Sequence, residues 1–146
     1  MKNMISADFT DMAISAAPPL QSSKRILIVE DDELCVKLLD RILTRVGYTV
    51  RAYRCTENIL ILIENFKPDL VLLDYSLPIL NGEILCNQIK RCAKTRLLPV
   101  IICSAYNNMF LSVSRYGCDS FVGKPFNPTY LVQKIKNHLQ KAEMRF

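Results

Sequence analysis

Short apolar runs alternate along this chain with longer segments in which apolar residues recur every three or four positions. The runs at 25–29, 69–73 and 98–102 are apolar almost throughout, which is typical of strands covered by helices on both faces. Two weaker strands are expected at 49–52 and 120–122. This alternation of strand and helix patterns predicts an α/β fold.

The helical spacing is clearest after the first strand. Six apolar residues recur there and lead to Gly47, a residue suited to end a helix: Leu34, Leu38, Leu39, Ile42, Leu43 and Val46. Further helices are expected at 57–66, 82–92, 109–115 and 127–141. Right-handed crossovers would place these helices on both faces of a five-stranded parallel sheet.

The length of 146 residues fits one domain. Segment 1–23 has no sustained period and ends in a Pro-Pro and Ser-Ser stretch, so we expect a flexible N-terminal extension or linker. The folded domain is expected at 24–141, followed by a tail at 142–146 with no room for a second folded module.

Composition excludes several classes of protein. Half of the residues are hydrophobic and 23% are charged, which is the balance of a globular domain. The longest aliphatic runs are too short to span a bilayer, and Asp8 and Asp11 interrupt any secretory signal, so a cytoplasmic location without membrane insertion is expected.

The cysteines and the net charge add little chemistry. The six cysteines form no C-x-x-C pair and lie mostly in apolar segments. We therefore expect them to act as small hydrophobic residues rather than to form a zinc site or a disulfide framework. The single His138 is expected on a helix surface. The charge of +5 is spread without a recognition motif, so direct nucleic-acid binding is not expected.

Polar groups follow the expected strands at their carboxyl ends. Glu30, Asp31 and Asp32 follow the first strand, Asp74 the third, Ser104 the fourth and Lys124 the fifth. Ligands of open α/β sheets bind beyond the carboxyl ends of the strands. The pattern therefore predicts a site of carboxylates, one hydroxyl and one ammonium.

These groups suit phosphoryl transfer to a carboxylate. Clustered carboxylates need a cation, and an all-oxygen donor set favours Mg²⁺, held mainly by Asp31 and Asp74. Asp74 would be the nucleophile, Lys124 would pair with the phosphoryl oxygens, and Ser104 would donate a hydrogen bond to one of them. Each residue alone could instead be a helix cap or turn residue, but capping does not require all of them at successive strand ends.

The chain resembles the receiver domains of two-component response regulators across nearly all of Lys24 to Lys141. The matching segments are Ile26-Leu27-Ile28-Val29-Glu30-Asp31-Asp32, Pro68-Asp69-Leu70-Val71-Leu72-Leu73-Asp74, Leu77-Pro78, Asn81-Gly82, Ser104-Ala105 and Gly123-Lys124-Pro125-Phe126. The resemblance implies a flavodoxin-like fold with strand order 2-1-3-4-5.

The resemblance also implies a metal shell and a mechanism. Glu30, Asp31, Asp74 and the backbone carbonyl of Ser76 would hold Mg²⁺, with Mn²⁺ as a substitute, and a cis bond before Pro125 would aim Lys124. A histidine kinase or histidine phosphotransfer protein would deliver the phosphoryl group to Asp74. Phosphorylation would be self-catalysed and reversed by slow autodephosphorylation, so the chain would be a signalling domain rather than an enzyme acting on a separate substrate.

By the same resemblance, four residues would belong to the switch and output region: Ala105, Tyr106, Arg115 and Phe121. The output face would comprise the fourth helix, fifth strand and fifth helix, and would bind a downstream protein or a second copy of the chain in a phosphorylation-dependent homodimer. Ser104 and Lys124 are 20 positions apart, a little short for the family, so the fourth helix would be short, shifted or poorly ordered.

Other functions are alternatives. A pseudo-receiver would keep the fold as a non-switching interaction scaffold. An aspartyl-phosphate phosphatase would need a second Asp two positions after the nucleophile, where this chain has Ser76. Direct DNA binding is prompted only by the basic charge.

Overall fold

The computed structural model describes residues 22–105 and 117–145. Its elements are β1 (Arg25–Val29), α2 (Glu33–Val46), β2 (Thr49–Tyr53), α3 (Ile59–Phe66), β3 (Leu70–Asp74), α4 (Gly82–Arg91), β4 (Val100–Ser104), β5 (Ser120–Gly123) and α6 (Pro128–Glu143). The helix expected at 109–115 lies outside the described residues. In the described part of the chain, no helix is long and apolar enough to cross a membrane.

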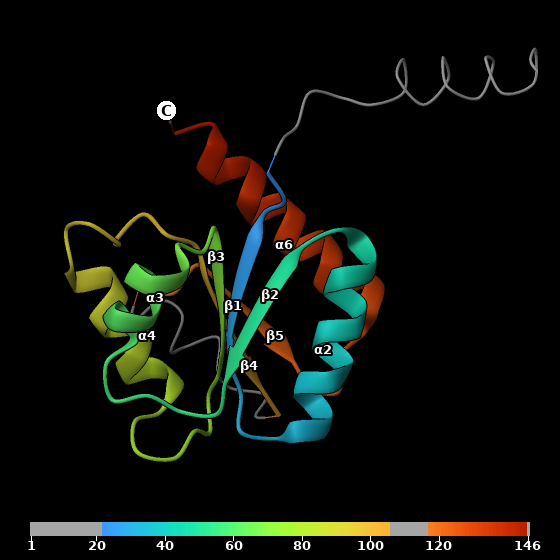
Figure 1. Cartoon of the computed structure of the whole chain (residues 1–146), viewed down its shortest axis with the longest axis horizontal. Helices are drawn as coiled ribbons and strands as arrows, with labels where there is room; N and C mark the ends of the chain where they lie inside the picture. The colour runs from blue at the N-terminus through green and yellow to red at the C-terminus, as the bar shows by residue number, and fades with distance from the viewer. Residues whose placement is uncertain (1–21, 106–116, 146) are drawn as a thin grey trace, which may run out of the picture.

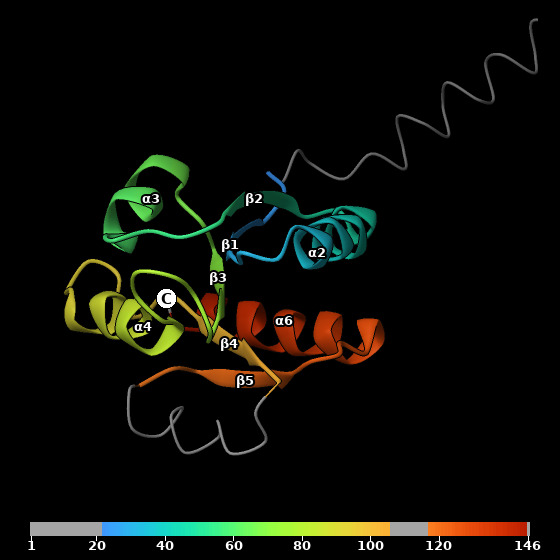
Figure 2. The ribbon, with the colours of Figure 1, turned by 90° about the horizontal axis from the view of Figure 1, so that it is seen from below.

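The strands form one parallel sheet in the order β2-β1-β3-β4-β5, which confirms the predicted fold and strand order. All five carboxyl ends therefore lie at one edge of the sheet, toward the lower end of the molecule in Figure 1. α2 and α6 cover one face, and α3 and α4 cover the other (Figure 2).

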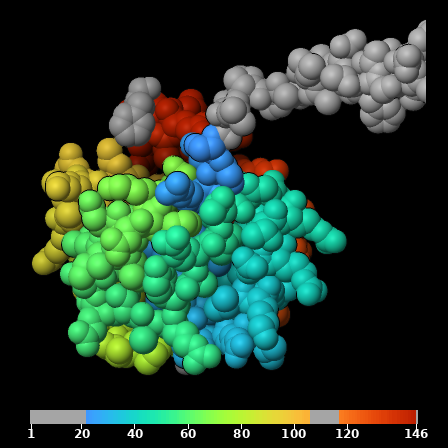
Figure 3. Space-filling view, viewed as in Figure 1, coloured from blue at the N-terminus to red at the C-terminus, as the bar shows by residue number. Residues whose placement is uncertain are grey.

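Each face of the sheet has its own core, because alternate residues of a strand point to opposite faces. Leu27, Val29 and Leu73 pack toward α3 and α4, whereas Ile28 and Leu72 pack toward α2 and α6. β3 and β4 are buried at every position, as predicted for strands covered on both sides. In the space-filling view, residues from β1 to α4 form most of the visible surface of the domain (Figure 3).

Two strands begin later than expected, and both shifts matter for the site. β3 spans Leu70–Asp74 and β4 spans Val100–Ser104, so Asp74 and Ser104 are the last residues of their strands rather than loop residues. Pro99 precedes β4 and has no N–H for a ladder, which accounts for the later start. α6 runs to Glu143, two residues beyond the expected end of the domain at 141.

The expectation that no cysteines are bridged is wrong for one pair. Cys86 on α4 and Cys118 before β5 form a disulfide, with Cα atoms 6.2 Å apart and 32 positions between them in the sequence. This separation lacks any local spacing motif, so only the fold brings the two residues together. The other cysteines, Cys35, Cys55, Cys92 and Cys103, are free as expected.

α4 is attached a second time to the same short segment. The Nζ of Lys90 lies 2.7 Å from Oδ2 of Asp119, and this oxygen also accepts the backbone N–H of Val100 at 2.8 Å. Lys90 donates further hydrogen bonds to the carbonyls of Arg96 and Leu98. Since Lys90 follows Cys86 by one helical turn and Asp119 follows Cys118 directly, the two links together anchor the start of β5 to α4.

We expect Lys90→Ala to lower the free energy of unfolding by about 2 kcal/mol. The two side chains are only 13% and 18% exposed, so the substitution leaves the Asp119 carboxylate with little water to replace the ammonium. Urea unfolding at pH 7 measures the change. Lys37→Ala is the matched control, because the pair of Lys37 with Glu33 is 70% and 64% exposed and should contribute less than about 0.5 kcal/mol. Equal losses in the two variants would contradict the anchoring role of Lys90.

Candidate functional site

The predicted acidic residues meet at the carboxyl edge of the sheet. Glu30, Asp31 and Asp74 each offer a carboxylate oxygen, and these oxygens lie within 4.8 Å of one another. Glu30 and Asp74 are buried, with 2% and 7% exposure, whereas Asp31 is exposed. Three like charges at this distance repel one another, so the cluster depends on nearby positive charge.

The local backbone explains how the acidic residues are placed. β1 and β3 are neighbours in the sheet, so Glu30 at the end of β1 comes close to Asp74 at the end of β3. The N–H of Glu30 donates to the carbonyl of Tyr53 at 2.9 Å, and its Oε1 accepts the N–H of Asp32 at 3.1 Å. Asp32 caps α2 by accepting the N–H of Leu34, so capping accounts for this third acidic residue.

Lys124 contacts both buried carboxylates. Its Nζ lies 2.6 Å from Oε2 of Glu30 and 3.1 Å from Oδ1 of Asp74. Its backbone N–H donates to the carbonyl of Ser104 at 2.9 Å, and the bond from Lys124 to Pro125 is cis. The cis bond is the isomer that the resemblance implies, whereas the pairing of Lys124 with Glu30 was not foreseen.

Burial and these ion pairs act in opposite directions on the pKa values of the two partners. Burial raises the pKa of Asp74, the hydrogen bond from Lys124 lowers it, and the charges of Glu30 and Asp31 raise it, so the pKa is above its ordinary value. Burial lowers the pKa of Lys124, but the hydrogen bonds to Glu30 and Asp74 outweigh burial and raise it. The ammonium of Lys124 therefore stays charged.

The remaining predicted site residues lie around this cluster. Ser104 is buried at the end of β4, with 2% exposure, and Ala105 after it is exposed. Phe121 is half-buried on β5, and Ser76 is exposed on the loop after β3. Tyr106 and Arg115 lie outside the described residues.

The loop after β3 is closed tightly against the strand. The N–H of Gly82 donates to the carbonyl of Tyr75 at 3.0 Å, and Asn81 caps α4 by accepting the N–H of Ile84. A Cβ atom on residue 82 would lie only 2.5 Å from the backbone oxygen of Asp74. Glycine is required here because the helix start must approach the backbone of Asp74 this closely.

The donor set fits a divalent cation. The three carboxylates and the ammonium of Lys124 leave an excess of two negative charges in one partly buried site. The three candidate side-chain ligands, Glu30, Asp31 and Asp74, are all carboxylates, and oxygen is the donor that Mg²⁺ and Mn²⁺ prefer. The exposed carboxylate of Asp31 leaves one side of the cluster open to solvent and to a hydrated ion.

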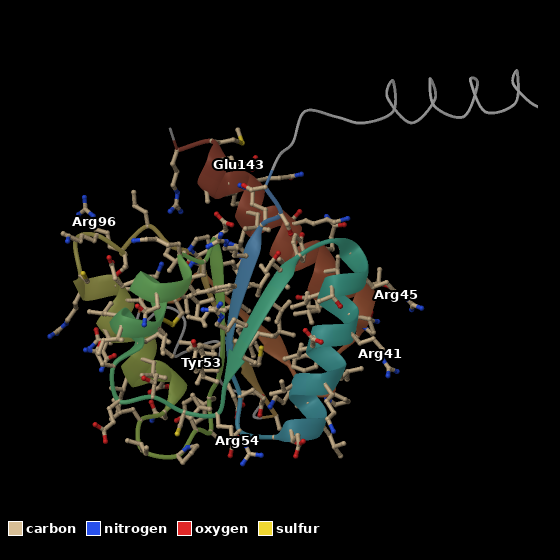
Figure 4. The ribbon with its side chains drawn as sticks, in the orientation of Figure 1. Arg41, Arg45, Tyr53, Arg54, Arg96 and Glu143 are labelled. Atoms are coloured by element: carbon tan, nitrogen blue, oxygen red, sulfur yellow. A yellow bond between two sulfur atoms is a disulfide. The ribbon has the colours of Figure 1, made fainter. Side chains whose placement is uncertain are left out.

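Two neighbours of the site were missed from the sequence. The thiol of Cys35 is hydrogen-bonded to the carboxylate of Glu30, and burial together with that charge raises its pKa to about 12. Arg54 directly follows β2, and its guanidinium lies 3.7 Å from Oε2 of Glu33 (Figure 4). The signal for Arg54 was its place at a strand end, the same signal that identified the acidic residues.

We expect Asp74→Asn to raise the free energy of unfolding at pH 7, measured with a chelator present, by on the order of 1 kcal/mol. A carboxyl whose pKa is raised in the folded state destabilises the folded protein progressively as the pH rises above the pKa of the unfolded state, so the charged form lowers stability at neutral pH. Asparagine keeps the shape and an oxygen acceptor for Lys124 without the charge. The gain should shrink as the pH falls from 7 toward 4, whereas a gain that is independent of pH would contradict the electrostatic explanation.

Comparisons with known proteins agree with this geometry. The family model described as the response regulator receiver domain matches residues 26–136. The chain is 34% identical over 124 residues to the alkaline phosphatase synthesis transcriptional regulatory protein PhoP of Bacillus subtilis, covering 84% of this chain and 51% of that protein. It is 36% identical over 121 residues to the uncharacterized transcriptional regulatory protein YvcP of the same organism, covering 81% and 49%. The chain thus spans about half the length of these two relatives.

Solved structures give the same result. A CheY-like response regulator receiver domain protein from Methanospirillum hungatei is 31% identical, with a TM-score of 0.78 over 86% of this chain and 100% of that one. The signal receiver domain of a signal transduction histidine kinase from Syntrophus aciditrophicus is 27% identical, with a TM-score of 0.75 over 82% of this chain and 92% of that one. The chain belongs to the response regulator receiver domain family.

Proposed function

We propose that this chain is a phosphoacceptor switch that takes a phosphoryl group on the carboxylate of Asp74. The observation that supports this most directly is the position of Asp74 at the end of β3, beside Glu30 and Asp31 and 3.1 Å from the ammonium of Lys124. A nucleophilic carboxylate, a cation for the phosphoryl oxygens and an acidic metal site are the parts that this chemistry needs.

Each residue has a role in the proposed reaction. An oxygen of Asp74 attacks phosphorus, and the bond to the donor's leaving group breaks in line with the attack. Lys124 moves from its carboxylate partners to the incoming phosphoryl oxygens, and the Ser104 hydroxyl donates to one of them. Mg²⁺, held by Glu30, Asp31, Asp74 and the carbonyl of Ser76, would neutralise the negative charge of the site and of the phosphoryl group.

Family membership supports a proposal for the phosphodonor, but it does not name the recipient of the signal. A histidine kinase or histidine phosphotransfer protein is the proposed phosphodonor in the cytoplasm, and slow autodephosphorylation of the acyl phosphate resets the switch. The relatives are transcriptional regulators about twice as long as the matched segment, and one structural relative is part of a histidine kinase. The downstream partner of this chain is therefore proposed only as a protein that distinguishes the two states of the domain.

Intact-mass spectrometry tests the phosphoacceptor role. After incubation with acetyl phosphate and Mg²⁺, the wild-type chain should gain the mass of one phosphoryl group. Asp74→Asn and a chelated sample should gain none, because each lacks a required part of the site. Asp40→Asn is the matched control, since Asp40 is exposed on α2 and should not affect the adduct.

If neither acetyl phosphate nor phosphoramidate gives an adduct, the phosphoacceptor proposal is wrong. The non-switching interaction scaffold would then be the better description. The pairing of Lys124 with Glu30 already balances part of the acidic charge without any phosphoryl group, which suits such a scaffold.

We further propose that the signal leaves through the face that includes β5 and α6, together with the helix expected at 109–115. Phe121 is half-buried on β5, and its carbonyl accepts a hydrogen bond of 2.8 Å from Nζ of Lys134 on α6. A movement of Lys124 toward phosphate is transmitted directly along β5 to Phe121 and its contact with α6. The same face would form the phosphorylation-dependent homodimer.

Amide chemical shifts test this output face. With beryllium fluoride and Mg²⁺ as a phosphate mimic, we expect the largest shifts outside the site itself at residues 105–135, including Phe121. The amides of α3 should change little, because that helix packs on the opposite half of the sheet. Unchanged shifts at residues 105–135 in a protein that binds the mimic would contradict the proposed output face.

A further inference from the structure

A hollow opens beside the acidic cluster, on the side of β2. It has a volume of about 180 Å³ and is lined by Glu30 and Asp31 on one side and by Tyr53 and Arg54 on the other. Val36 and Ala52 form the apolar part of the wall of this hollow. Pockets for drug-sized ligands are typically larger, so this space accommodates a small group rather than a large ligand.

The charge around the hollow is predominantly negative. Glu30, Asp31 and Glu33 all line it, while the ammonium of Lys124 is already engaged by Glu30 and Asp74. A phosphodonor carries up to about two negative charges on its phosphoryl group, so this rim repels it. Arg54 is the cation among the described residues that line the hollow.

The guanidinium of Arg54 is held only loosely. Its NH2 nitrogen lies 3.7 Å from Glu33, the two side chains are 74% and 64% exposed, and Glu33 is shared with Lys37 at 3.4 Å. An exposed pair of this kind contributes little stability. Arg54 can therefore leave Glu33 and bind a phosphoryl group with little loss of free energy. Guanidinium groups also bind phosphoryl oxygens through two parallel hydrogen bonds.

We propose that Arg54 is a donor-binding residue that draws the anionic phosphodonor into the hollow before transfer. The hollow is lined by Glu30 and Asp31, and each of these offers a carboxylate oxygen within 4.8 Å of one of Asp74. The inference rests on the proposed phosphoacceptor function and adds a residue that recognises the phosphoryl dianion of the donor. With an acyl phosphate, the bond from phosphorus to the acyl oxygen breaks, the carboxylate leaves with the electron pair, and the phosphorus bond to Asp74 forms. No proton or other reactant is required.

Arg54→Gln tests the inference through two quantities that should change in opposite directions: the rate of phosphorylation and the affinity for Mg²⁺. The second-order rate of phosphorylation by acetyl phosphate at saturating Mg²⁺ should fall about fivefold at low ionic strength, and less at 0.15 M salt. The affinity for Mg²⁺, measured by calorimetry without any phosphodonor, should rise, because a positive charge near the carboxylates is removed. A variant that had merely lost structure would show both quantities falling.

Arg41→Gln and Arg45→Gln are matched controls. They remove the same charge, but both residues lie on the outer side of α2, away from the end of the molecule where Arg54 lies (Figure 4). Both controls should keep the wild-type rate within about twofold. The inference is overturned if Arg54→Gln reacts as fast as these controls at low ionic strength while the wild type still phosphorylates on Asp74.

A second phosphodonor shows whether Arg54 recognises the phosphoryl group or the acyl group of acetyl phosphate. Phosphoramidate, with a phosphorus–nitrogen bond like that of phosphohistidine, should show the same sensitivity to Arg54→Gln if the residue binds the phosphoryl group itself. Loss of rate with acetyl phosphate alone would contradict this assignment, because Arg54 would then be recognising the acyl group.

Discussion

The structure of this site depends on one ammonium between two buried carboxylates. Glu30 and Asp74 lie in a place from which water is largely excluded, and Lys124 is within 3.1 Å of both. Without that ammonium, the pair would carry an uncompensated charge that a folded protein can hardly retain. In the proposed phosphoacceptor reaction, a cation that binds these carboxylates would compete with Lys124 and leave it available to a phosphoryl group. Cation binding and phosphoryl binding would then be linked through one side chain, and each would favour the other.

Much of the fold was predictable because its physical causes are local. Buried strands with helices on both faces require long apolar runs, and these runs were visible in the sequence at β1, β3 and β4. The site was predictable for a related reason. In a parallel sheet every strand ends at the same edge, so residues such as Asp74 and Lys124, far apart in the chain, are brought together by topology alone.

What could not be predicted depends on distances that only the packed structure determines. The bridge between Cys86 and Cys118 has no spacing signature, and Lys124 was assigned to a phosphoryl group while its contact with Glu30 went unforeseen. Arg54 was overlooked because an exposed arginine after a weak strand is common, and its importance comes from the hollow beside it. The assignments of Tyr106 and Arg115 remain predictions, because they lie outside the described residues.

The double attachment of α4 to Cys118 and Asp119 affects how β5 can move. Within residues 22–105 and 117–145, β5 is an edge strand that pairs with β4 alone, and Lys124 directly follows its far end. A strand of four residues is about 13 Å long, so a displacement of about 1 Å at Lys124 corresponds to a rotation of roughly 4° about the fixed start. Because the start of β5 is attached to α4, a displacement at Lys124 is accommodated more readily by a tilt of the strand than by a slide along its axis.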